Sequence, residues 1–302
     1  MNIIGRRKFW FALSLLVIIP GIISIIFRWV TVGSPLNLGI DFTGGTITAV
    51  EFNKDITVPQ VRDALKEITV DKTTLDKSII QLSGNRTAII RTLVLDDQKQ
   101  AEVLTKLSEK IGPYDKSKLR VDKVGPVIGK ELTQKAIMAL AVASILMVIY
   151  ISFRFEIKFG IAAVIALLHD VFVVLGIFSI FWWEVDSAFV AAVLTIIGYS
   201  INDTIVIFDR IRENLKKRKK GQDLETLVNN SILQTMTRSI NTVLTVVFVL
   251  VALLLFGGST IKFFTLAMLI GVISGAYSSI FNASPLWFVF KGMKWGRARA
   301  RA

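Results

Sequence analysis

The chain has 302 residues, of which 53% are hydrophobic, and its mean hydropathy of +0.59 excludes an ordinary soluble domain and indicates a membrane protein with several spans. Its lack of cysteine excludes disulfide bonds and thiolate metal sites. The formal net charge is +13, but residues 31–131 carry 15 Lys and Arg against 14 Asp and Glu, so the remaining +12 lies in short segments beside apolar runs. That distribution is typical of membrane topology and gives little reason to expect a nucleic-acid partner.

Six apolar runs are long enough to cross a bilayer, which takes roughly 20 residues in a helix. We expect spans at residues 9–30, 132–153, 159–182, 188–208, 239–256 and 263–290. The first run is too long for the apolar part of a typical signal peptide, and no small-residue cleavage site follows it. We therefore expect a retained membrane helix within residues 1–30.

The positively charged loops predict the orientation. Basic residues precede the first run, separate the second from the third, follow the fourth at 210–220 and follow the last at 291–301. Because such residues are enriched in cytoplasmic loops, both termini, including the basic tail 291–302, are predicted to be cytoplasmic. Residues 31–131 then lie on the opposite side of the membrane, and 132–290 contain the other five spans.

The segment 31–131 is predicted to fold as a compact domain. Strands are expected at residues 46–52, 78–82, 87–94 and 119–124, the middle two joined by the hairpin signal Ser83-Gly84-Asn85. One helix is expected at 58–68, and a second begins at Asp96 and ends before Gly112, with Ala101, Leu104 and Leu107 on its buried face. The resulting order βαββαβ predicts a ferredoxin-like α+β fold.

Asp203 is the most informative residue, because it lies within a run that is otherwise apolar. A carboxylate at membrane depth disfavours insertion by about 2.5 to 3.5 kcal/mol, so such residues are usually retained for an ion pathway or a buried partner. Desolvation and a nearby cation act on its pKa in opposite directions, and their balance can bring it near the working pH. The alternative is an aspartate that only holds two helices together by hydrogen bonding.

Arg238 is the natural partner for Asp203. The aspartate lies about five residues from the cytoplasmic end of its span, roughly 7 to 8 Å at 1.5 Å per residue, and Arg238 enters the next span from the same side. The two residues can therefore share a depth. An arginine at a helix start is also a common interfacial anchor whose charge reaches the headgroups, so both interpretations stay open.

His169 and Asp170 lie midway along the third span. As His169 is the only histidine, a histidine metal cluster is excluded, and a proton relay or a packing hydrogen bond remains. In the last span Gly271 and Gly275 are four residues apart, which permits close helix packing. No phosphate-binding loop or Ser/His or Cys/His nucleophile arrangement is present, so an ion gradient is the expected energy source and neither enzyme activity nor a cofactor is expected.

The chain resembles the SecF branch of the SecD/SecF family of bacterial protein-export membrane proteins, which is related to the resistance-nodulation-division transporters. The resemblance rests on four segments: LGIDFTGG at 38–45, VGPVIG at 124–129, LHD at 168–170 and GYSINDTIVIFDRIREN at 198–214. The signature residues within these segments are Asp41, Gly44, Gly45, Gly198, Asp209 and Arg210. The resemblance extends over essentially the whole chain.

The resemblance implies that this chain is half of a twelve-helix transporter in the bacterial plasma membrane. Its second half is a SecD chain, and together they use the proton motive force to complete the translocation of unfolded preproteins. The implied further partners are the SecYEG channel, SecA, membrane lipid and, more distantly, YidC and YajC. In this family the aspartate of the Asn202-Asp203-Thr204 motif carries the proton and an arginine matching Arg238 assists, and we add Asp170 as a coupling candidate.

Two other functions stay open at this point. A proton-coupled exporter of small molecules or lipids belongs to the same superfamily, although an outer domain of about 100 residues is small for a substrate-lined porter. A passive scaffold for assembly of the translocon is the third reading. A carboxylate serves H⁺ or Na⁺ equally well, so the coupling ion is not predicted.

Overall fold

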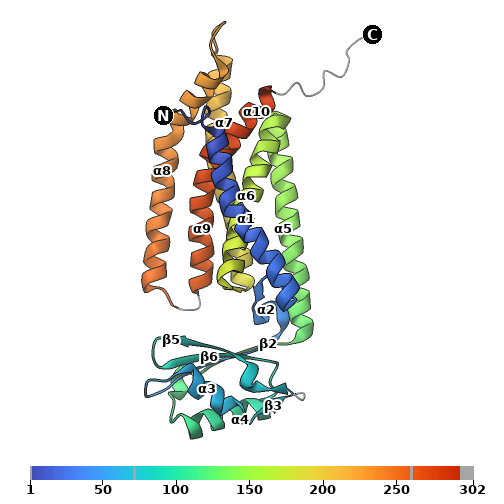
Figure 1. Cartoon of the computed structure of the whole chain (residues 1–302), viewed down its shortest axis with the longest axis vertical. Helices are drawn as coiled ribbons and strands as arrows, with labels where there is room; N and C mark the ends of the chain where they lie inside the picture. Colours follow the sequence, from blue (N-terminus) through green and yellow to red (C-terminus); the bar gives the residue numbers. More distant parts are fainter. Residues whose placement is uncertain (1, 71–72, 259–260, 293–302) are drawn as a thin grey trace, which may run out of the picture. The chain divides into compact units, whose positions relative to one another are not determined.

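The structure is a computed structural model that describes residues 2–70, 73–258 and 261–292 (Figure 1). It divides into two compact units. The helical unit contains the chain up to Asn37 and from Met138 onwards, and the smaller unit is Leu38–Ile137. Of the predicted basic tail 291–302, the residues from 293 onwards lie outside the described residues.

Six helices in the described part of the chain are long and apolar enough to cross a membrane, which confirms the predicted number of spans. They are α1 (Arg7–Val32), α5 (Pro126–Arg154), α6 (Ile157–Phe181), α7 (Ser187–Lys216), α8 (Leu224–Phe256) and the last helix, which comprises α9 (Lys262–Ser278), the π-helical segment η4 (Ser279–Ala283) and α10 (Ser284–Gly292). Single-turn π segments of this kind are frequent at functional sites.

Helices α7 and α8 are longer than the apolar runs that predict them. α7 continues to Lys216 and α8 begins at Leu224, where the Asp223 carboxylate caps it by accepting a hydrogen bond from the Thr226 amide at 2.8 Å. Placing Arg238 at a helix start was therefore wrong, because it lies in the interior of α8. The polar ends of both helices were missed because the hydrophobic pattern stops where the helices leave the apolar layer.

The predicted close packing of the last helix is confirmed. α9 packs against α7, α6 and α8. A Cβ atom on Gly275 would lie 3.0 Å from Ser200 Cβ, and one on Gly271 would lie only 2.3 Å from Ile196 Cδ1. Small residues at such positions let two membrane helices approach closely, so α7 is held firmly on its α9 side.

Helix α1 crosses α6 through a second glycine contact (Figure 1). A Cβ atom on Gly21 would lie 2.7 Å from the Gly176 Cα, closer than side chains tolerate. One turn further along, the hydroxyls of Ser24 and Ser179 are 3.0 Å apart and form a hydrogen bond. The crossing therefore depends on the absence of side chains at Gly21 and Gly176.

The smaller unit has the predicted ferredoxin-like fold. Its four-stranded antiparallel sheet has the order β5-β6-β2-β7, formed by Ile79–Ser83, Thr87–Thr92, Gly45–Glu51 and Arg120–Val124. Helices α3 (Val58–Leu65) and α4 (Asp97–Lys110) contribute apolar side chains to one core with the sheet. Short elements complete the unit: α2 (Ile40–Thr43), β3 (Thr69–Val70), β4 (Thr73–Thr74) and the turns at Leu75–Lys77 and Lys116–Lys118. The short strand β1 (Asn37–Leu38) spans the boundary at which the two units divide.

The predicted buried face of α4 was partly wrong. Val103 and Leu107 are fully buried and Leu104 packs beside them, but Ala101 is exposed. Gln100 is buried instead, and its side-chain amide donates a hydrogen bond to Thr48 Oγ1 at 3.1 Å. The buried stripe thus includes a polar residue that a search for apolar spacing passes over.

Gly45 occupies a backbone position that only glycine fits. Its φ is +144°, and a Cβ there would lie 2.7 Å from the Thr92 carbonyl oxygen. We expect Gly45→Ala to lower the free energy of unfolding of the smaller unit by about 1 to 3 kcal/mol, as strained backbone positions do. Thermal unfolding of the purified protein would measure this, with Gly125→Ala as the control, because a Cβ on Gly125 meets nothing within 4 Å. Equal melting of both variants would contradict the prediction.

Glu67 links α3 to α4 through two lysines. Its carboxylate is 2.5 Å from Lys110 Nζ and 3.3 Å from Lys106 Nζ. The hydrogen bonds from Lys110 and Lys106, with their charges, hold the pKa of Glu67 below its usual value of 4.5. A carboxylate whose pKa is lowered on folding stabilises the fold above that usual value, and the contribution is lost as the pH falls through the lowered value.

We therefore expect Glu67→Gln to melt at a lower temperature than the parent at neutral pH, by a small amount because the pair is exposed. The difference should shrink as the pH falls below 4.5 and vanish once the pH is below the lowered pKa of Glu67. Melting curves of both proteins at a series of pH values test this. A difference that persists unchanged at pH values well below the usual pKa would show that Glu67 acts by something other than its charge.

Candidate ion-coupling site

Asp203 lies on the face of α7 that contacts α8. Its Oδ1 accepts a hydrogen bond from the Ser239 hydroxyl at 2.7 Å. Its Oδ2 is buried and has no hydrogen-bond partner among the described residues. An unpaired buried carboxylate oxygen is costly, so this atom is a candidate position for a proton or a new partner.

Arg238 immediately precedes Ser239, and its side chain is exposed. It is close enough to act electrostatically on the Asp203 carboxylate. Within the described part of the chain, however, no ion pair joins the two at 4.0 Å or less. The structure therefore brings the two predicted residues to one region, with Ser239 rather than Arg238 in direct contact.

The other predicted coupling residue on α7, Asn202, is exposed and does not bond to Asp203. A further contact here was not predicted from the sequence: the Tyr199 hydroxyl donates a hydrogen bond to the Thr242 carbonyl oxygen at 3.0 Å. Together with the bond from Ser239 to Asp203, it ties α7 to α8 at two points on α8 that both follow Arg238. Neither the Ser239–Asp203 bond nor the Tyr199–Thr242 bond can be predicted from the sequence without knowing how α7 is aligned with α8.

Asp170, on α6, forms a second polar centre that meets α7 at Ser200, three residues before Asp203. Its side chain is 1% exposed. Three hydroxyls donate hydrogen bonds to it, those of Ser200, Ser274 and Ser278 at 2.6 to 2.7 Å, and His169 Nδ1 lies within hydrogen-bond distance at 3.0 Å. Both carboxyl oxygens of Asp170 therefore have hydrogen-bond partners, whereas one oxygen of Asp203 has none among the described residues.

The signature residues that follow Asp203 hold the end of α7 against its neighbours. Asp209 forms an ion pair with Arg154 at 3.2 Å, while Arg210 pairs with Glu213 within α7 at 2.9 Å. Asn214 donates hydrogen bonds to Ser231 and Gln234 of α8. These contacts anchor the helix ends and do not extend the carboxylate site.

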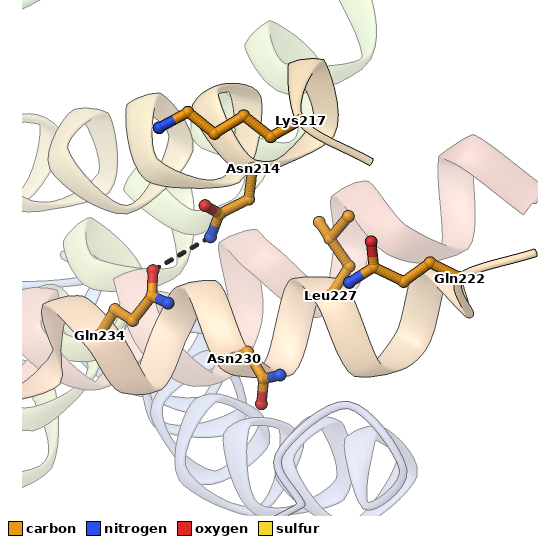
Figure 2. A pocket seen from close by; sticks show the side chains of 6 residues that line it. All are labelled: Asn214, Lys217, Gln222, Leu227, Asn230 and Gln234. Carbon is orange, nitrogen blue, oxygen red and sulfur yellow. Dashed lines mark hydrogen bonds between the residues drawn. The ribbon is translucent and has the colours of Figure 1, made fainter. Parts of the chain in front are cut away.

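A polar pocket of about 170 Å³ lies between the ends of α7 and α8 (Figure 2). Figure 2 shows the Asn214 amide pointing toward Gln234 across it. The lining residues are Asn214, Lys217, Gln222, Leu227, Asn230 and Gln234. They contain no carboxylate and no histidine, so the pocket has no titrating acid of its own with which to couple an ion.

The remaining signature residues, Gly198, Asp41 and Gly44, differ in how closely they are packed. A Cβ on Gly198 would meet nothing within 4 Å, so close packing within this chain does not require glycine there. Asp41 lies in α2 and is half-buried. A Cβ on Gly44 would lie 3.0 Å from Pro126 Cα, which ties this turn to the start of α5. Among the described residues, no group of three His, Cys, Asp or Glu could hold a metal ion.

Comparison with known proteins identifies the family. Residues 103–293 match the family described as Protein export membrane protein SecD/SecF, C-terminal, and residues 29–56 match the SecD/SecF GG Motif. Protein translocase subunit SecF of Sebaldella termitidis is 40% identical over 294 residues, 97% of this chain and 93% of the relative. Protein translocase subunit SecDF of Bacillus subtilis is 45% identical over 294 residues, which cover 95% of this chain but only 38% of the longer relative.

Solved structures agree with this assignment. The crystal structure of SecDF from Thermus thermophilus, titled a translocon-associated membrane protein, matches 97% of this chain with a TM-score of 0.83 and 34% identity. SecDF in a super-membrane-facing form matches the same share at the same identity, with a TM-score of 0.68. This chain spans only 39% of either solved chain. The chain belongs to the SecD/SecF family of protein-export membrane proteins.

Proposed function

We propose that this multi-pass membrane protein acts with a SecD-type partner to couple the proton motive force to the late stage of preprotein export across the bacterial plasma membrane. The observation that carries the proposal is the Oδ2 atom of Asp203, a buried carboxylate oxygen without a hydrogen-bond partner in the described chain. Intramembrane carboxylates of this kind mark ion pathways. Relatives named SecF and SecDF translocase subunits support the export role.

The proposed mechanism turns on the charge of Asp203. A proton entering from the outer side neutralises the carboxylate and weakens its attraction to Arg238 and its hydrogen bond from Ser239. The α7–α8 contact then repacks, and release of the proton to the cytoplasm restores it. One charge crossing the membrane supplies about 2.3 kcal/mol per 100 mV, enough to bias two states that differ by a few kcal/mol.

The partner is proposed to complete the site. In the Bacillus SecDF protein and the solved SecDF structures, this chain corresponds to less than two fifths of a longer polypeptide. A SecD-type partner is proposed to supply the part of those proteins that this chain does not match. The export channel SecYEG, the ATPase SecA and the accessory proteins YidC and YajC are further proposed partners, with the unfolded preprotein as substrate.

Inverted membrane vesicles carrying the complete translocon test the proposal. The gradient-dependent part of preprotein export should disappear when this protein is depleted and return when it is restored. An ionophore that collapses the proton gradient should have the same effect as depletion. If export by the restored vesicles is insensitive to the ionophore, the coupling role is wrong.

The two alternative functions predict different results in the same system. A small-molecule or lipid exporter would change drug or lipid efflux in a deletion strain and leave preprotein export intact. A passive scaffold would be needed for export but indifferent to the charge at Asp203.

A further inference from the structure

Asp170 is the most deeply buried titratable side chain among the described residues, and the proposed mechanism does not use it. It is held between three helices, since it lies on α6 while its serine donors come from α7 and α9. Its two oxygens have all their donors within the described chain, whereas Asp203 has one oxygen without a partner. A saturated carboxylate is poorly suited to exchanging protons and well suited to fixing the helices that surround it.

Ser200 is the donor that connects Asp170 to the proposed coupling site. It lies on α7 three residues before Asp203, and its hydroxyl is 2.6 Å from Asp170 Oδ2. Thr204, one turn after Ser200 on the same face, bonds to Ser279 at 2.8 Å, where η4 begins. Two successive turns of α7 are therefore held by hydrogen bonds, one at Ser200 and one at Thr204. Asp203 lies between these two residues in the sequence and contacts α8 through Ser239.

The geometry points to a positioning role: we propose that Asp170, acting through Ser200, sets the rotation of α7 that aims Asp203 at Ser239. A rotation of about 20° would move a side-chain atom about 5 Å from the helix axis by about 2 Å. A displacement of that size breaks a hydrogen bond of 2.7 Å such as the one from Ser239. This inference rests on the proposed coupling function of Asp203.

Two serine variants separate positioning from general stabilisation. Ser200→Ala and Ser274→Ala each remove one hydroxyl that donates a hydrogen bond to Asp170, at 2.6 and 2.7 Å respectively. Of the two serines, only Ser200 belongs to α7. We expect Ser200→Ala to lower gradient-dependent export in translocon vesicles about tenfold, well within the 100-fold that a 1 Å misplacement of a reacting group can cost. Ser274→Ala should lower it by less than about twofold, since α7 keeps its link to Asp170.

A cross-linking measurement reports the rotation of α7 directly. Because the chain has no cysteine, Asp203→Cys and Ser239→Cys together introduce a single pair across the α7–α8 contact. Oxidation should join the pair readily in this background and at least about fivefold more slowly when Ser200→Ala or Asp170→Asn is added, because disulfide formation requires close Cβ atoms. Ser274→Ala should leave the rate unchanged, and the melting temperature of each variant confirms that it is folded.

The outcomes distinguish this inference from the proposed function. If Asp203→Asn abolishes gradient-dependent export but Ser200→Ala and Ser274→Ala behave alike, Asp170 has only a structural role and the positioning inference is wrong. An unchanged cross-linking rate in both Ser200→Ala and Asp170→Asn overturns it as well. If Asp203→Asn itself leaves gradient-dependent export intact, the proposed coupling function of Asp203 is wrong, and the positioning inference that rests on it is wrong as well.

Discussion

Asp203→Asn should remove gradient-dependent export while leaving the protein folded. Asparagine has nearly the volume of aspartate, and its carbonyl oxygen can still accept the hydrogen bond that Ser239 donates to Asp203. It cannot take or release a proton, and the loss of a proton-transfer group typically costs about 100-fold or more in rate. The variant should thus be present in the membrane at normal abundance and fail in export.

Cells depleted of their own homologue and complemented with each variant measure this effect. Pulse-labelled preproteins should accumulate with Asp203→Asn as they do without complementation. Asp223→Asn is the matched control, because Asp223 caps α8 outside the apolar layer and asparagine is an equally good capping residue. Normal export of preproteins by cells that carry Asp203→Asn would contradict the proposed coupling role of the Asp203 carboxylate.

Gly176→Leu should detach α1 from α6. The Cβ of any residue at position 176 would lie 2.7 Å from the backbone of Gly21, where no rotamer change can relieve the contact. Overpacking of this kind costs about 1 to 3 kcal/mol, and a leucine side chain adds further atoms at the same point. We expect the helices to separate, with the hydrogen bond between Ser24 and Ser179 lost.

Cysteines in place of Ser24 and Ser179 would report this separation in the otherwise cysteine-free chain. Oxidation should cross-link α1 to α6 in the parent and fail with Gly176→Leu. Gly160→Ala, on the same helix, is the control, because its Cβ would meet only the Ile151 side chain at 3.5 Å. Efficient cross-linking with Gly176→Leu would mean that the glycine contact does not hold the crossing.

The sequence predicts the fold well because the signals that define it are local. Six apolar runs give six helices, and alternation with turn residues gives the four main strands of the smaller unit. The errors have local causes too. The polar ends of α7 and α8 carry no apolar signal, which is why Arg238 was placed at a helix start rather than within α8.

The candidate site was predictable only in part. Asp203 stands out because a charge in an apolar run is visible in one dimension. Ser239, which actually contacts it, does not stand out, because the contact depends on how α7 and α8 are aligned. Similarly, Ser274 and Ser278 lie beside the predicted packing glycines in the sequence, and their bonds to Asp170 are visible only once α9 is packed against α6.

The most direct test imposes defined ion gradients on reconstituted vesicles that contain the full translocon with this protein and its SecD-type partner. A pH gradient, acidic on the outer side, should accelerate the late stage of preprotein export with the parent chain and have no effect with Asp203→Asn. A sodium gradient of equal size should have no effect with either. Acceleration of Asp203→Asn by the pH gradient to the same extent as the parent would contradict the proposal that Asp203 couples proton entry to export.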